Sequence, residues 1–126
     1  MDALEDAFPQ ATVWLDDLEE AVADAERALR ARDWALLDEA NQRQPRLIHG
    51  LRNSLEAERP GCSVALQRAM DQRIDQIVAV RASQIERLTV FREEVKERLL
   101  MLDRFRKAAR SSAAKCQQAS TFAIMR

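Results

Sequence analysis

The residues whose types could support chemistry are few in this sequence. Two acidic pairs, Asp16-Asp17 and Glu19-Glu20, carry carboxylates of the kind that bind divalent cations, and His49 is the single histidine. One histidine cannot supply the pair of imidazoles typical of zinc sites. With two glycines in the chain, the glycine-rich loops that cradle phosphates and dinucleotides are excluded. We therefore expect no enzyme, no metal site and no cofactor, and we interpret residues 16–20 as a solvated acidic face.

The two cysteines, Cys62 and Cys116, lie far apart and match no metal-ligand spacing. This pattern favours free thiols in a reducing, cytoplasmic compartment, with a disulfide or an intersubunit bridge as the alternative. No apolar run approaches the roughly 20 residues that span a bilayer. The acidic N-terminus MDALEDAF is unlike a signal peptide. We expect a cytoplasmic protein without a membrane span.

The remaining chemistry is apolar recognition, and it concentrates in the stretch ERLLMLDRFRKAAR, residues 97–110. Apolar side chains recur at the three- and four-residue steps by which a helix anchors itself in a partner's groove. Neighbouring apolar residues widen the patch, and methionine suits an adaptable surface. The sequence therefore predicts a partner-binding surface made of Val95, Leu99, Leu100, Met101, Leu102 and Phe105.

The composition predicts that helices alone must position this surface. A third of the 126 residues are charged, glycine and proline total five, and tyrosine is absent. Good helix formers dominate and β-formers are scarce. We expect an all-α protein of one domain, residues 1–126, built as an antiparallel helical hairpin or three-helix bundle with a long third helix of coiled-coil character.

Local signals divide the chain into elements. The first helix is predicted over 10–31 after Phe8-Pro9, and the second over 34–58 after Asp33, a plausible N-cap. Pro45 predicts a kink in the second helix. The turn at 58–63 precedes a long helix over 64–110. Residues 111–126 could be a frayed extension, a short fourth helix or a tail, and Trp14 and Trp34 are expected core anchors.

These lengths leave part of the third helix uncovered. At 1.5 Å per residue the first two helices reach roughly 35 Å, whereas a helix over 64–110 reaches roughly 70 Å. The hairpin can cover only its first half. Apolar residues in the second half then meet another segment or another chain, as exposed apolar patches commonly do.

Charge is distributed unevenly along the chain. Residues 1–63 carry 14 acids and 7 bases, whereas residues 64–126 carry 7 acids and 13 bases. Helix-dipole matching and complementary helix faces can explain the asymmetry. Alternatively, the basic C-terminal region contacts an acidic partner. Nucleic acid is the less favoured partner, because Phe105 and Phe122 are the only aromatics among those bases and no recognition motif accompanies them.

The succession of elements resembles a known family. The first amphipathic helix, the segment ALRARDWALLDEANQRQPRLIHGL and the long uninterrupted helix are similar to the flagellar type III export chaperones of the FliT and FlgN type. The shared pattern falls on Ala28-Leu29, Arg32-Asp33-Trp34, Leu37, Arg43, Leu47 and Leu51. The resemblance spans most of the chain, and Pro45 departs from it.

The resemblance implies a non-enzymatic cytoplasmic chaperone of type III secretion. Such a protein binds an amphipathic C-terminal helix of a secreted subunit of the bacterial flagellum, prevents premature assembly and aids delivery to the export apparatus. In the cap-chaperone type a C-terminal helix covers the binding surface, and here the masking residues would be Phe122, Ile124 and Met125. The alternatives are an antiparallel homodimer paired through the second half of the long helix, and a regulator that sequesters a partner protein.

Overall fold

The chain is all-α, as its composition predicts. The computed structural model describes the backbone of residues 2–125 and the side chains of residues 2–116. In these ranges it contains helices and no strand. The four helices are α1 (Ala3–Ala7), α2 (Pro9–Ala31), α3 (Trp34–Glu58) and α4 (Val64–Met125).

The helix bounds lie close to those predicted, with two differences. The sequence analysis missed α1, whose N-cap is Asp2, with a side chain that accepts a hydrogen bond from the Leu4 amide at 3.0 Å. Residues 111–125 continue α4 and do not form a separate fourth helix. Pro45 lies inside α3, and the helix runs through it. The predicted kink there stays a prediction.

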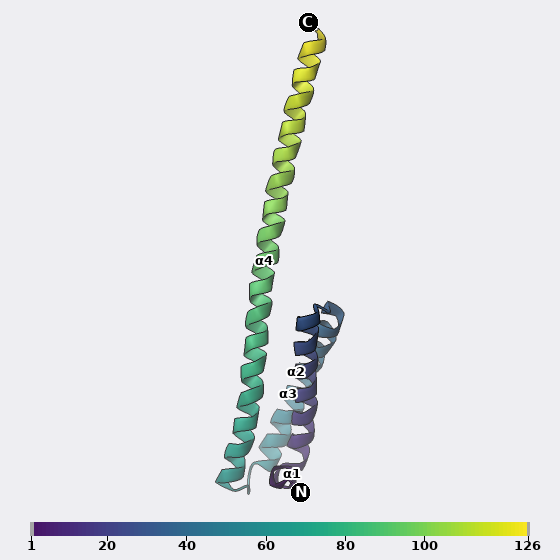
Figure 1. Cartoon of the computed structure of the whole chain (residues 1–126). Coiled ribbons are helices and arrows are strands. Elements are labelled where there is room, and N and C mark those ends of the chain that lie inside the picture. Colours follow the sequence, from purple (N-terminus) through teal and green to yellow (C-terminus); the bar gives the residue numbers. More distant parts are fainter. Residues whose placement is uncertain (1, 126) are drawn as a thin grey trace. The chain divides into compact units, whose positions relative to one another are not determined.

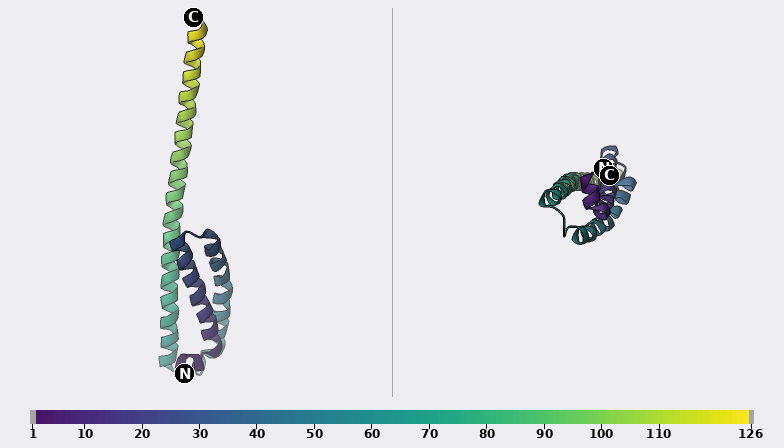
Figure 2. Two further views of the ribbon diagram at one scale, coloured as in Figure 1. Left: turned by 45° about the vertical axis from the view of Figure 1, so that its right-hand side comes forward. Right: turned by 90° about the horizontal axis from the view of Figure 1, so that it is seen from below.

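The chain divides into two compact units, residues 1–86 and residues 87–126. The first unit contains α1, α2, α3 and the beginning of α4, and the second consists of the rest of α4. Figures 1 and 2 show α2 and α3 as the antiparallel hairpin of the first unit, with α1 at the N-terminal end of α2. The expectation of a single domain stays a prediction.

The core of the first unit is an apolar cluster to which α2 contributes the most residues. Residues of α2 at three- and four-residue steps turn one face inward, the arrangement of an amphipathic helix. Leu51 of α3 and two residues from the beginning of α4 complete the cluster. Its buried members are Phe8, Ala11, Leu15, Leu18, Val22, Leu51, Met70 and Ile77.

The two tryptophans have different positions. Trp14 packs against the core, as predicted, and lies so close to α3 that a Cβ atom added at Gly50 would stand 2.5 Å from Trp14 Cδ2. Gly50 thus lets the indole lie against the backbone of α3. Trp34 is 43% exposed, so its predicted role as a core anchor is wrong. It is the first residue of α3, next to the turn between α2 and α3 and outside the buried core cluster.

A residue from the far end of α3 caps the N-terminus of α2. Phe8 occupies the N-cap position and offers no side-chain hydrogen bond. Instead the Glu58 carboxylate accepts hydrogen bonds from the backbone amides of Gln10 (2.7 Å) and Ala11 (3.1 Å). A negative charge on unpaired amides at this end is favourable. The contact joins the two ends of the α2–α3 hairpin.

We expect Glu58→Ala to lower the free energy of unfolding by about 1–2 kcal/mol, because two helix-start amides lose their acceptor. Urea denaturation measures the change. Glu56→Ala is the matched control, since Glu56 is exposed on the same helix and is expected to shift stability by no more than about 0.5 kcal/mol. Equal effects of the two substitutions would contradict the capping role.

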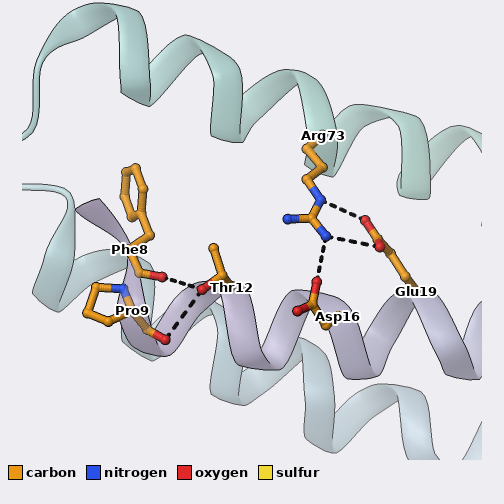
Figure 3. A network of polar contacts seen from close by, with 6 residues as sticks. All are labelled: Phe8, Pro9, Thr12, Asp16, Glu19 and Arg73. Atoms are coloured by element: carbon orange, nitrogen blue, oxygen red, sulfur yellow. Dashed lines mark hydrogen bonds and ion pairs between the residues drawn. The ribbon is translucent and has the colours of Figure 1, made fainter. Parts of the chain in front are cut away.

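An ion-pair network attaches the beginning of α4 to α2 (Figure 3). Arg73 Nε donates to Glu19 Oε1 at 2.8 Å, and Arg73 Nη2 donates to Asp16 Oδ1 at 2.6 Å. The hydrogen bond with Glu19 is the main cause that raises the pKa of Arg73 above its ordinary value, and Asp16 adds to it against burial. Further along, the buried Gln84 donates through Nε2 to the Val22 carbonyl oxygen at 3.0 Å.

Asp24 forms a second ionic contact, between α2 and α3. Arg43 Nη2 donates to Asp24 Oδ2 at 2.7 Å, and Arg27 pairs with the other carboxylate oxygen. The hydrogen bond from Arg43 lowers the pKa of Asp24 below 3.8, burial opposes it, and Arg27 lowers the pKa further. A carboxyl with a depressed folded-state pKa stabilises the fold above its unfolded pKa. That contribution is lost as the pH falls through the lower folded-state value.

We therefore expect Asp24→Asn to remove part of the acid sensitivity of the fold. Near neutral pH the variant should lose about 1–2 kcal/mol of stability; the difference from the wild type should begin to shrink as the pH falls below about 3.8 and vanish below the lower folded-state pKa. Urea denaturation at several pH values measures it. Asp75→Asn, at an exposed position, is the control, and a constant difference across the pH range would contradict the assignment.

Candidate functional site

The predicted partner-binding residues lie on α4 in the unit of residues 87–126, and all six are exposed. The exposed fractions include 62% for Leu99, 52% for Leu102 and 72% for Phe105, with Val95 the least exposed at 36%. Large apolar side chains with this exposure at helical spacing are unusual for a surface without a partner. Within residues 87–116, no side chain is buried.

Helix geometry separates the six residues into groups. With about 100° per residue, Leu99 and Leu102 fall within about 40° of the direction of Val95, and Phe105 lies about 80° to one side. Met101 lies beyond Phe105. Leu100 points about 140° away from Val95, on the opposite side of the helix. We call Val95, Leu99, Leu102 and Phe105 the apolar stripe.

Toward its N-terminal end the apolar stripe is continued by Leu88 and Phe91, which are half-buried. Both keep the same face, since they fall within about 40° of Val95. Their positions extend the row to about five helical turns, longer than the roughly three turns of an average helix in globular proteins. The stripe is thus long enough to take a whole helix of a partner.

Basic side chains line one edge of the apolar stripe. Arg92, Lys96 and Arg110 lie about 60–100° from Val95 on the Leu99 side, and Arg98 and Arg106 lie among the stripe residues themselves. Glu94 borders the Phe105 side, Asp103 borders the Leu99 side and is bound by Lys107 at 3.1 Å, and Glu93 and Glu97 lie about 160° away, on the opposite face. Among the described residues, none of the five bases has a carboxylate within ion-pair distance.

The predicted masking residues Phe122, Ile124 and Met125 lie outside the residues whose side chains are described. The backbone of α4 extends to Met125. The masking hypothesis therefore stays a prediction.

The sequence analysis did not predict an apolar groove in the unit of residues 1–86. The groove lies between α3 and the beginning of α4, has a volume of about 610 Å³ and is lined chiefly by Ile48, Leu51, Leu55, Pro60 and Ile74. Arg59 lies at its edge and pairs with Asp71 at 2.9 Å. The groove depends on how far α3 and the beginning of α4 lie apart, which the periodicity of either helix does not give.

The residues considered for chemistry have ordinary partners. Asp16 and Glu19 are bound by Arg73, and the described residues contain no group of acids, cysteines or histidine placed to hold a metal ion. His49 Nε2 lies 3.2 Å from Asn53 Nδ2. Cys62 and Cys116 are both free, and the Cys62 thiol donates to the Glu58 carbonyl oxygen at 3.2 Å.

Neither a membrane span nor a similar protein indicates what the chain does. No helix in the described part of the chain is both long and apolar enough to cross a membrane. Searches against family models, curated proteins and solved structures find no match to this chain. The function must therefore be argued from the chain's own surface.

Proposed function

We propose that this protein is a non-enzymatic adaptor that binds an amphipathic helix of a partner protein along the apolar stripe. The observation that carries the proposal is the exposure of Leu99, Leu102 and Phe105 on one side of α4. Covering the apolar stripe, about three helical turns, removes several large apolar side chains from water, each worth about 1.5–3 kcal/mol when fully buried. This is the arrangement used in helix-in-groove and coiled-coil recognition.

The resemblance to flagellar type III export chaperones gives the proposal its biological form. As such a chaperone, the protein binds a C-terminal amphipathic helix of a secreted flagellar subunit in the cytoplasm. Binding prevents premature assembly of the subunit and aids delivery of the subunit to the export apparatus. The support comes from the order of the helices and from the ALRARDW segment, which closes α2 at Ala31 and caps α3 through Asp33. The proposal needs no cofactor and no membrane span.

The proposal is tested by titrating the purified full chain with the C-terminal segments of the secreted filament-cap and hook-associated proteins of the same bacterium. Isothermal titration calorimetry should give one segment per chain and a negative heat-capacity change, the mark of apolar burial. If none of these segments binds, the export function is wrong. Binding that survives Leu99→Asp with Leu102→Asp unchanged would place the site elsewhere.

A further inference from the structure

The charges around the apolar stripe indicate which charge a partner helix carries beside its apolar face. Residues 87–126 carry ten bases and four acids, a net charge of +6, whereas residues 1–86 carry 17 acids and ten bases. Three of the bases line the Leu99 edge of the stripe and two more lie within its width, whereas Glu93 and Glu97 occupy the opposite face. A helix that docks on the stripe therefore meets positive charge along one edge and among the apolar residues.

We infer that the partner helix carries acidic residues beside its apolar face. This inference rests on the proposed function and specifies the chemistry of the partner. In paired helices the residues beside the apolar seam set partner choice through their charges. Arg92 lies about 60° from Val95, beyond the Leu99 edge of the stripe, and Arg98 lies between the directions of Leu102 and Phe105, so acidic side chains beside the apolar face of a docked helix can reach both.

A second copy of the chain fits this surface poorly. Residues 87–110 hold eight bases and four acids, so two copies paired along their stripes would bring together segments of +4 each. Like charges on either side of an apolar seam repel each other and so disfavour this pairing. Two copies paired stripe to stripe thus leave these bases without partners of opposite charge, which a helix with acidic flanks supplies.

An anionic membrane surface also fits less well. Helices that lie in a bilayer interface combine a basic polar face with an apolar face. Here the acids Glu94 and Asp103 border the stripe, where an interfacial helix of this kind is rich in lysine and arginine, and the opposite face mixes Glu93 and Glu97 with Arg104 and Lys115. A protein helix with acidic flanks satisfies the border bases without placing these carboxylates against anionic lipid.

The experiment uses two designed helical peptides with the same leucine face, one with glutamate and one with lysine at the positions that flank it. Fluorescence anisotropy measures the affinity of each peptide for the full chain. We expect the glutamate peptide to bind at least about tenfold more tightly at about 0.05 M salt, and the preference to shrink at about 0.5 M salt. Equal affinities would overturn the inference.

Two charge-reversal variants make the test specific to position. Arg92→Glu with Arg98→Glu changes the border, and we expect it to abolish the preference for the glutamate peptide. Arg104→Glu with Lys115→Glu changes the net charge equally on the opposite face, about 180–200° from Val95, and should keep the preference. If both variants respond alike, net charge rather than the border selects the partner and the inference fails.

Further arms separate this inference from the proposed function. If Leu99→Asp abolishes binding of both peptides but the wild type does not distinguish them, the apolar docking stands and the charge inference is overturned. If Leu99→Asp leaves binding of both peptides unchanged, the proposed function fails. Binding to phosphatidylglycerol vesicles without binding to either peptide, or self-association that Arg92→Glu with Arg98→Glu does not alter, would overturn the inference.

Discussion

Gly50→Ala is expected to destabilise the protein by about 1–3 kcal/mol, although alanine is the better helix former by about 1 kcal/mol. The new methyl group would stand 2.5–2.7 Å from three ring atoms of Trp14, closer than carbon atoms pack. Either the indole leaves its position against the core, or α2 and α3 move apart. Both changes cost apolar packing in the most closely packed helix pair of the first unit.

Urea denaturation of a double-mutant cycle measures this coupling. In a Trp14→Leu background the ring is gone, so Gly50→Ala should be neutral or stabilising through helix propensity. The reversal of sign between the two backgrounds is the decisive result. If Gly50→Ala has the same effect with and without the tryptophan, the close approach is not what requires glycine.

Leu99→Asp with Leu102→Asp is expected to weaken binding of the partner helix by at least about 100-fold, because central apolar anchors commonly contribute 2 kcal/mol or more each. The fold should be unaffected, since both side chains are exposed and touch no core residue. Calorimetric titration with the bound subunit segment measures affinity, and thermal unfolding verifies the fold.

The chain offers a matched control for this substitution. Leu100 is 50% exposed and adjacent to Leu99, but it points about 140° away from Val95. Leu100→Asp should therefore leave affinity within about threefold of the wild type, less than about 0.7 kcal/mol. A loss as large as that of the double substitution would show that the helix docks by another face or that the charge acts nonspecifically.

Elements with strong local signals could be predicted closely. The limits of α3 follow from the Asp33 cap, whose carboxylate accepts from the Leu36 amide at 3.2 Å, and from the turn at 58–63. The helix α1 was missed because five residues carry little periodicity. The exposure of Trp34 was also missed, because the helical period gives a residue's face but not where along the helix the core ends.

Features that depend on contacts between distant residues had no signal in the sequence. The cap of α2 by Glu58 joins residues 47 and 48 positions apart, and the groove beside Ile74 depends on how far α4 lies from α3. The exposure of the candidate site residues could be predicted from the helix lengths, since these residues belong to one helix, whereas their binding role stays a prediction. The sequence shows a run of four apolar residues, 99–102, but not which of them share a face. That Leu100 points away from the stripe follows only once α4 is known to be a continuous helix.

The central claim is that the apolar stripe is where a partner helix docks. Hydrogen–deuterium exchange of the full chain, with and without the glutamate-flanked peptide, tests it most directly because it maps the bound surface along the chain. The account predicts slower amide exchange over residues 91–106, where the helix is otherwise exposed, and unchanged exchange over residues 48–60. Protection centred on residues 48–60 and 67–74 would contradict it and assign docking to the groove between α3 and α4.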